Sequence, residues 1–263
     1  MKFSEHWLRT MADPPITSAE LCERLTMAGL EVEETAKAAP PFSGVVVGRI
    51  ERVDAHPNAD RLKVCLVDIG TPERLSIVCG APNAAAGMKA PCAKVGAHLP
   101  GGLAITRTAV RGVESQGMLC SAKELGIAED ASGLLTLPAT ALVGADLRKV
   151  LDLDDTLITL KLTPNRADCL SMLGIAREVT ALTGAALRPP PAADVPVATQ
   201  AAREVRVEDP AACPRFVSRT IEGIDARAAR PEWMKQRLER CAVRSISAVV
   251  DVTNYVMLEL GQP

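Results

Sequence analysis

Short apolar runs with strand-like spacing fill the middle of the chain. Residues 45–53 are rich in β-branched side chains, and residues 62–69 divide into two faces with a period of two. Further short runs follow at 75–79, 89–95, 105–110 and 134–137, with Gly and Pro between them. Short strands at this spacing, broken by turn residues, predict a small β-barrel.

The flanks of this region have helical spacing. The first 39 residues are predicted to be helical, and Thr17 with Glu20 forms a capping box at the start of one helix. On the other side, a strand is predicted at 157–162. A helix then follows, which Asp168 is expected to cap and which runs to about Thr183.

A Pro- and Ala-rich stretch at 188–201 is predicted to be a linker, and a third unit follows it. Strands are expected at 205–207 and 216–221, and Pro231 is expected to open a helix. The buried face of that helix is predicted to contain Met234, Leu238 and Cys241. The pattern stops at Pro263 without a closing element, which predicts a truncated piece of a longer protein.

The charge balance excludes a globally basic nucleic-acid binder, because the net charge is −2. Residues 40–150 hold 12 Lys and Arg against 10 Asp and Glu, hence +2, and the remainder holds 18 against 22, hence −4. None of the aromatic residues lies within 45–150. A binder that stacks bases on aromatic rings is therefore not indicated, and contact through backbone and shape is the better prediction.

The sequence lacks the signature motifs of several classes of enzyme. There is no Gly-rich phosphate loop, no H-E-x-x-H and no G-x-S-x-G, so we predict no catalytic residue and no ATP site in this chain. The eight cysteines form no C-x-x-C pair and are predicted to be buried thiols without a metal. No apolar run has membrane length and the N-terminus lacks a signal peptide's apolar core, so a soluble cytoplasmic protein is expected.

Three blocks in the middle region point to a more specific function. They are His-Pro-Asn-Ala-Asp-Arg-Leu-Lys-Val at 56–64, Val-Cys-Gly-Ala-Pro-Asn at 78–83 and Arg-Gly-Val-Glu-Ser-Gln-Gly-Met-Leu-Cys-Ser at 111–121. In this order and spacing they resemble the tRNA-binding OB module. The candidate tRNA-contacting residues are Arg61, Lys63, Lys89, Arg107, Arg111, Ser115 and Met118, with Lys94 and Lys123 as further phosphate contacts. For each single Lys or Arg, a solvated surface charge is the alternative.

The flanking segments at 162–178 and 244–263 resemble the β subunit of bacterial phenylalanyl-tRNA synthetase, as does the start Met-Lys-Phe-Ser-Glu-His-Trp-Leu. The resemblance covers the whole chain. It implies an α+β multidomain protein in which an OB barrel at 40–151 is inserted into a small α+β domain made of 1–39 and 152–187. After the linker, residues 202–263 would begin an α/β editing-type domain pair.

That family charges tRNA-Phe with ATP and Mg²⁺ as a heterotetramer of two α and two β chains. The resemblance places the synthetase site on the α subunit and the magnesium ligands later in the β subunit, so this piece alone is expected to be inactive and to hold no cofactor. Arg244, Asp251 and Asn254 are the candidates beside the editing pocket; buried structural hydrogen bonds are the alternative for Asp251 and Asn254. Ala167 and Ser247 stand where many relatives have Gly and Asn.

Two other functions remain open at this stage. One is a stand-alone tRNA-binding or chaperone module without a synthetase partner, which would lack the blocks at 162–178 and 244–263. The other is an OB domain for a small ligand or a protein, which would show no salt-dependent tRNA binding.

Overall fold

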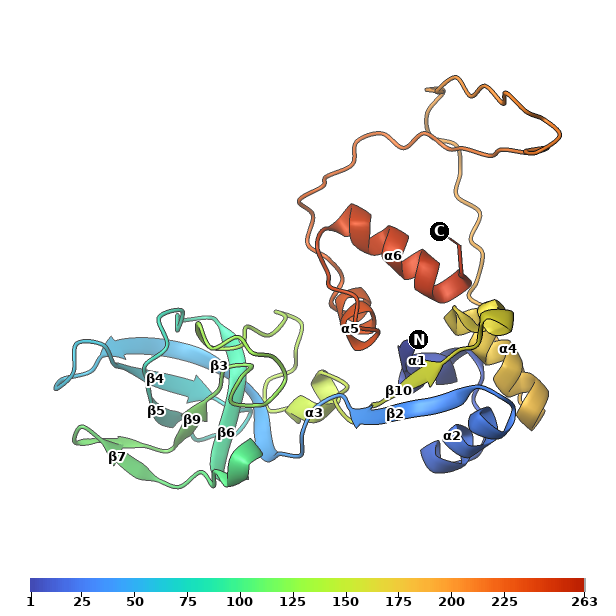
Figure 1. The fold of residues 1–263 in the computed structure, drawn as a ribbon. Helices are drawn as coiled ribbons and strands as arrows, with labels where there is room; N and C mark the ends of the chain where they lie inside the picture. The colour runs from blue at the N-terminus through green and yellow to red at the C-terminus, as the bar shows by residue number, and fades with distance from the viewer. Residues whose placement is uncertain (263) are drawn as a thin grey trace. The chain divides into compact units, whose positions relative to one another are not determined.

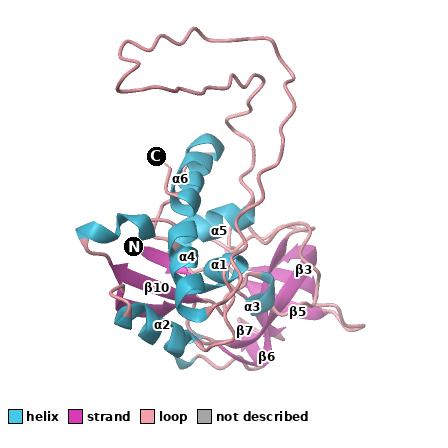
Figure 2. Cartoon of the chain, turned by 90° about the vertical axis from the view of Figure 1, so that its right-hand side faces the viewer, coloured by secondary structure: helices cyan, strands magenta, loops and turns pink. Residues whose placement is uncertain are grey.

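The computed structural model describes residues 1–262, and the chain divides into two units (Figure 1). Unit 1 contains residues 1–34 together with the chain from 158 onward, and unit 2 is the intervening segment 35–157. Unit 1 carries most of the helices and unit 2 most of the strands (Figure 2). The structure combines helices with a barrel-like sheet, so the predicted α+β class is confirmed at the level of mixed α/β content.

Unit 1 is built on a three-stranded sheet in the order β1-β10-β2, whose strands are Lys2–Ser4, Thr156–Lys161 and Glu31–Lys37. Its helices are α1 (Glu5–Met11), α2 (Ser18–Met27), the 3-10 helix η2 (Pro164–Cys169), α4 (Met172–Thr183), α5 (Glu232–Arg240) and α6 (Ala248–Leu260). The fully buried residues Trp7, Leu21, Ile158 and Ile175 lie in one core with residues of α5 and α6. Trp7 stacks on Tyr255 with ring centroids 5.0 Å apart, and Arg237 donates to the Tyr255 hydroxyl at 2.6 Å.

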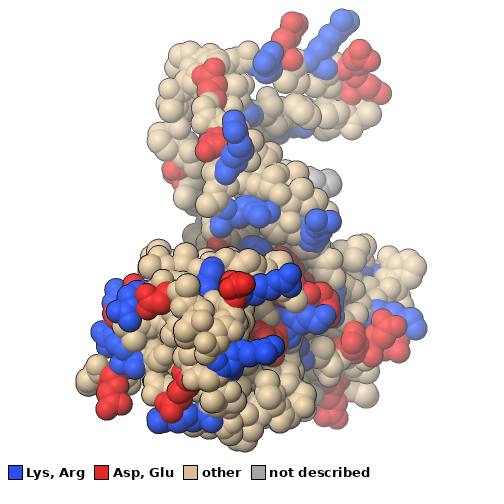
Figure 3. Space-filling model, turned by 90° about the vertical axis from the view of Figure 1, so that its left-hand side faces the viewer, with Lys and Arg blue, Asp and Glu red and all other residues tan. Residues whose placement is uncertain are grey.

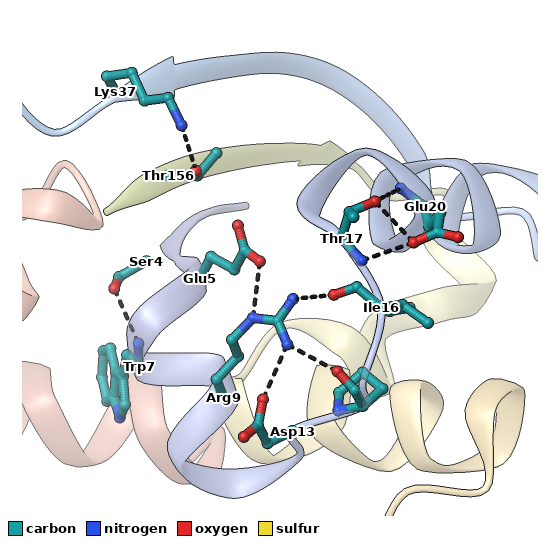
Figure 4. A network of polar contacts seen from close by, with 11 residues as sticks. Ser4, Glu5, Trp7, Arg9, Asp13, Ile16, Thr17, Glu20, Lys37 and Thr156 are labelled. Atoms are coloured by element: carbon teal, nitrogen blue, oxygen red, sulfur yellow. Dashed lines mark hydrogen bonds and ion pairs between the residues drawn. The ribbon is translucent and has the colours of Figure 1, made fainter. Parts of the chain in front are cut away.

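Polar contacts fix the first two helices of unit 1 (Figure 4). The capping box predicted at Thr17 is confirmed: Thr17 Oγ1 accepts from the Glu20 N–H, and the Glu20 carboxylate accepts from the Thr17 N–H at 2.7 Å. Arg9 donates to the Glu5 carboxylate at 2.9 Å and to the Ile16 carbonyl at 2.8 Å. The end of α1 is thereby tied to the turn that leads into α2.

Unit 2 contains a five-stranded barrel-like sheet in the order β5-β4-β3-β6-β9. These strands are Leu75–Cys79, Lys63–Asp68, Ser43–Ala55, Lys89–His98 and Gly117–Leu119. A two-stranded hairpin, β7 (Thr108–Val110) with β8 (Val113–Ser115), precedes β9. The short elements η1 (Pro100–Gly102) and α3 (Leu147–Val150) complete the unit. Gly48 on β3 leaves no room for a side chain, because a Cβ there would sit 2.9 Å from both the Cys92 and Val67 side chains.

The barrel is closed between β5 and the β8–β9 corner. The Gln116 N–H donates to the Ser76 carbonyl at 2.8 Å, and the Gln116 side-chain oxygen accepts from the Ser76 N–H at 3.1 Å. Two residues further along β5, the Val78 N–H donates to Ser115 Oγ at 3.1 Å. Side chains therefore supply part of the hydrogen bonding that a backbone ladder would give at this seam.

Four of the predicted strands in the middle region are confirmed, but two are wrong. The run at 105–110 forms a strand only from Thr108, and that strand pairs in the separate hairpin. The run at 134–137 is not a strand, although Leu135 and Leu137 donate single hydrogen bonds to the Cys120 and Lys89 carbonyls. The fifth strand of the sheet is instead β9. Its three residues are too few to show the alternation of apolar and polar residues that predicts a strand.

Further predictions fail outside the barrel. Residues 1–39 are not wholly helical, because β1 and β2 in this stretch pair with β10. Ser171, not Asp168, caps α4 by accepting from the Gly174 N–H at 3.0 Å, since η2 occupies the preceding residues. Residues 205–207 and 216–221 are not strands, and they belong to none of the sheets of the described residues. The helix after Pro231 is confirmed with its buried face.

Six of the eight cysteines are buried, so the expectation that all are buried is wrong for Cys22 and Cys213, which are half-buried. Burial raises the pKa of the Cys92 and Cys120 thiols to about 12, which fits small apolar side chains rather than reactive ones. Within residues 1–262, no helix combines the length and apolar character that a membrane span requires.

Candidate nucleic-acid interface

The first and third motif blocks meet at the tip of the β7–β8 hairpin. His56 Nε2 lies 3.1 Å from the Val110 carbonyl, and His56 Nδ1 accepts from the Asn58 N–H at 3.1 Å. The Asn58 amide donates to the Arg111 carbonyl at 3.0 Å. The His-Pro-Asn turn thus holds the hairpin, and residues 53 positions apart become neighbours.

The second block joins the other two. The Lys63 ammonium donates to the carbonyls of Pro82 and Ala84 at 2.9 and 3.0 Å, which ties the 80–84 loop to the start of β4. The Val78 N–H reaches Ser115 in the third block. All three blocks therefore form one hydrogen-bonded edge of the barrel.

The hairpin tip has a left-handed backbone conformation, which is unfavourable for arginine. Arg111 has φ +50° and Gly112 has φ +87°, the pair of left-handed residues that a two-residue type I′ turn requires. Asn or Gly normally occupies the first of these positions, and a larger side chain there costs about 1 kcal/mol. Strain of this kind is often retained where the side chain has a function.

Three basic side chains at or next to this edge are exposed and make no hydrogen bond or ion pair within unit 2: Arg61, Lys94 and Arg111. Arg61 lies in the turn that follows Asn58, and Lys94 pairs by register with Gly117 on β9. They are free to meet an external anion. Arg107 is also exposed, but its guanidinium lies 3.4 Å from the Glu114 carboxylate.

Four other candidates have contacts inside the protein. Lys63 holds the 80–84 loop, and Lys89 donates to the Ala139 carbonyl and, at 2.7 Å, to the Ala141 carbonyl. Ser115 is buried and donates to the Gly117 carbonyl at 2.9 Å in addition to accepting from Val78. Met118 is half-buried and packs against a buried apolar cluster that includes Val45 and Ala93. The structure thus gives each of them a structural task, and whether they also contact a ligand stays a prediction.

The charges around the barrel are largely paired. Arg49 and Arg74 both lie within 3.4 Å of Asp68, and Arg52 lies 2.8 Å from Asp54. Lys123 lies 3.8 Å from Glu129. Basic and acidic side chains are interspersed on the face seen in Figure 3, and no continuous basic patch appears there.

The candidate editing residues of unit 1 differ in environment. Asp251 is fully buried, and its carboxylate accepts from the Ser245 hydroxyl at 2.5 Å and from the Ile246 N–H at 2.8 Å. Burial raises the pKa of Asp251, but these hydrogen bonds outweigh it and hold the pKa below the usual range. Arg244 is exposed and Asn254 half-buried. Asp251 therefore makes buried hydrogen bonds within the protein, as the alternative to a place beside the editing pocket expects.

The segment at 164–178 forms a compact local structure. Arg166 donates to the Asp168 carboxylate at 3.2 Å and to the Glu178 carboxylate at 2.8 Å. The hydrogen bond from Arg166 lowers the pKa of Asp168. Gly174 allows η2 to approach α4, because a Cβ there would lie 1.8 Å from the Asp168 carbonyl oxygen. Asp168, Cys169 and Glu178 are close enough to hold a cation, but a guanidinium already occupies that position.

His56 and Asn58 organise this edge, but they are not among the residues that the sequence predicts to contact tRNA. In the sequence the His-Pro-Asn turn predicts only a loop that presents Arg61 and Lys63. Nothing in the spacing of residues indicated that its side chains reach a hairpin about 50 residues away.

Two family models match the chain. A model described as "Putative tRNA binding domain" matches residues 45–146, and a model described as "B3/4 domain" matches residues 212–263. The phenylalanine–tRNA ligase β subunit of Bordetella pertussis is 60% identical over 263 residues, and that of Aromatoleum aromaticum is 61% identical over the same length. Each match covers 100% of this chain and 33% of the relative, so the chain spans about a third of the length of the curated relatives it matches.

Among solved structures, a MetRS-related protein from Pyrococcus horikoshii is similar to 38% of this chain, with 26% identity and a TM-score of 0.29. The match covers 85% of that protein. A likeness of that size bears on neither the fold nor the function.

Proposed function

We propose that this chain, which belongs to the family of phenylalanine–tRNA ligase β subunits, contacts tRNA through the barrel of unit 2. The observation that carries the proposal is the convergence of the three motif blocks at one edge of the barrel. That edge leaves Arg61 and Arg111 exposed, and their side chains make no hydrogen bond or ion pair with the described residues of unit 2. Unpaired guanidinium groups on a fixed surface are suited to phosphate contacts.

The barrel is proposed to be an OB fold inserted at 40–151 into the small α+β domain of unit 1. Its sheet order and the closure between β5 and the β8–β9 corner support this, because a five-stranded, partly open Greek-key barrel has this arrangement. OB barrels bind oligonucleotides on one sheet face and the adjoining loops. Residues 202–263 are proposed to begin the editing-type region, with Arg244 and Asn254 near its pocket.

The whole protein is proposed to charge tRNA-Phe in the cytoplasm, using ATP and Mg²⁺ and working with an α subunit in a complex of two α and two β chains. The acidic group of unit 1 around Asp168 does not fit Mg²⁺, since Arg166 already pairs with both carboxylates. We therefore assign no magnesium or ATP step to residues of that group, and the 263-residue chain alone is expected neither to activate phenylalanine nor to deacylate mischarged tRNA.

A stand-alone tRNA-binding module is the less favoured alternative, because the β-subunit relatives match the chain along its entire length and not only over the barrel.

The test is a tRNA-binding titration of the 263-residue chain at several salt concentrations. Arg61→Ala and Arg111→Gly should each weaken binding and make the salt dependence shallower by about one charge. Glycine at 111 keeps the left-handed turn and relieves its strain, so a loss of binding reports on the missing arginine side chain rather than on a distorted turn. Lys149→Ala, which removes an exposed cation on α3, serves as the matched control. Binding that does not respond to salt or to either arginine variant would refute the proposal.

A further inference from the structure

His56 is buried although it is polar, with 6% of its surface exposed. Both ring nitrogens have partners from different parts of the chain. Because Nδ1 accepts from the Asn58 N–H, the pattern assigns the ring proton to Nε2, which then donates to the Val110 carbonyl. The imidazole therefore links its own turn to the last residue of β7.

Asn58 holds the other side of the same hairpin tip. Its amide donates to the carbonyl of Arg111, the residue with φ +50°. A Cβ at the adjacent Gly112 would lie 3.5 Å from the Asn58 amide nitrogen, so the turn and the amide are in close contact. The orientation of the Arg111 backbone is thus fixed by a side chain from the Arg61 turn.

The tip needs such support. β7 and β8 have three residues each and pair only with one another, outside the five-stranded sheet. An isolated two-stranded hairpin is marginally stable in water. The base of this hairpin is held by Ser115 and Gln116, whereas the tip is held by His56 and Asn58.

We propose that His56 and Asn58 are positioning residues for tRNA binding: they fix the hairpin tip so that Arg61 and Arg111 face the ligand as a preorganised pair. The inference rests on the proposed tRNA contact and deepens it. Without these two side chains, the hairpin tip would become ordered only when tRNA binds. The entropy lost in that ordering would lower the affinity.

The experiment measures tRNA affinity of the 263-residue chain for Asn58→Ala, alone and combined with Arg111→Gly. Asn58 is exposed, so the single variant should fold, and circular dichroism checks this. We expect Asn58→Ala to weaken binding roughly 3- to 10-fold in the natural background and less than about 2-fold when Arg111 is already glycine. A merely structural role would give the same loss in both backgrounds.

Asp146→Ala is the matched control, because Asp146 lies outside the three motif blocks. Its carboxylate caps α3 by accepting from the Lys149 N–H at 3.2 Å. This variant should lower stability without weakening tRNA binding. For the histidine, His56→Gln can retain a donor toward Val110, so it should bind tRNA better than His56→Ala.

Two results would overturn the inference, and they are distinguishable. If Arg111→Gly weakens binding but Asn58→Ala does not, the positioning role is wrong and the tRNA contact stands. If neither Arg61→Ala nor Arg111→Gly changes binding, the proposed function itself fails and the positioning role with it.

Discussion

Ser115 offers a direct test of whether a motif residue contacts tRNA or closes the barrel. Its hydroxyl accepts from the Val78 N–H at 3.1 Å and donates to the Gly117 carbonyl at 2.9 Å, and only 5% of the residue is exposed. Ser115→Ala removes both hydrogen bonds and leaves a backbone donor and a backbone acceptor at the seam without partners.

The expected loss of stability follows from these two groups. Each buried polar group left without a partner costs about 1–3 kcal/mol, so the loss of two should lower the free energy of unfolding by about 2–6 kcal/mol. For a unit of this size that corresponds to a drop in melting temperature of roughly 10 °C. Ser121→Ala is the control, since Ser121 caps a turn by bonding to Glu124 and should cost about 1 kcal/mol.

The assay must report on the barrel itself. Both tryptophans, Trp7 and Trp233, belong to unit 1, so their fluorescence does not follow unit 2. Urea unfolding by far-UV circular dichroism and hydrogen exchange at the Val78 amide are suitable. An unchanged urea midpoint with a still-protected Val78 amide would refute the closure role. A loss of tRNA affinity in the folded variant, well below its melting temperature, would make Ser115 a ligand contact instead.

Three further outcomes are expected. Lys89→Met should lower the urea midpoint because it releases the 139–141 segment, yet leave tRNA affinity unchanged; a changed salt slope would contradict this. Thr17→Ala should cost about 1 kcal/mol in denaturant unfolding, whereas Thr17→Ser should not. The folded pKa of Asp251 lies below its unfolded value of about 3.9, so its contribution to stability is complete above that value and lost as pH falls through the folded pKa. Asp251→Asn should therefore lower stability at pH 7 and flatten the acid side of the stability profile, and an unchanged profile would show that its hydrogen bonds contribute little.

Local patterns predicted the elements that carry their own signal. The capping box at Thr17, the two-faced strand 63–68 and the buried face of α5 are all set by side chains a few residues apart. β9 has three residues and exists because it pairs with β6. The apolar runs at 205–207 and 216–221 have high strand propensity. They are not strands, because propensity alone does not form a sheet without a second strand to hydrogen-bond with.

The candidate site shows the same division. Sequence identified the basic residues near the three motif blocks, yet their partners lie far away in the chain. Lys63 bonds to carbonyls 19 and 21 residues away, and Lys89 to carbonyls 50 and 52 residues away. Because these partners are so far away in the sequence, only the fold shows whether a lysine is free to bind a ligand or is hydrogen-bonded within the protein. Arg61 and Arg111 remain the candidate contacts, because within residues 1–262 their side chains make no hydrogen bond or ion pair.

The number of unpaired cations sets how strongly salt should weaken the tRNA contact. If Arg61, Lys94 and Arg111 each neutralise about one phosphate, the slope of log affinity against log salt should be about −2 to −3. A fourfold rise in salt would then weaken binding roughly 15- to 60-fold. Had all 12 basic residues of 40–150 been available, the slope would be near −8 and binding would nearly vanish. A measured slope steeper than about −5 would mean that the internal ion pairs of Arg49, Arg52 and Arg74 open when tRNA binds, and the barrel would then be a principal tRNA anchor rather than an auxiliary contact.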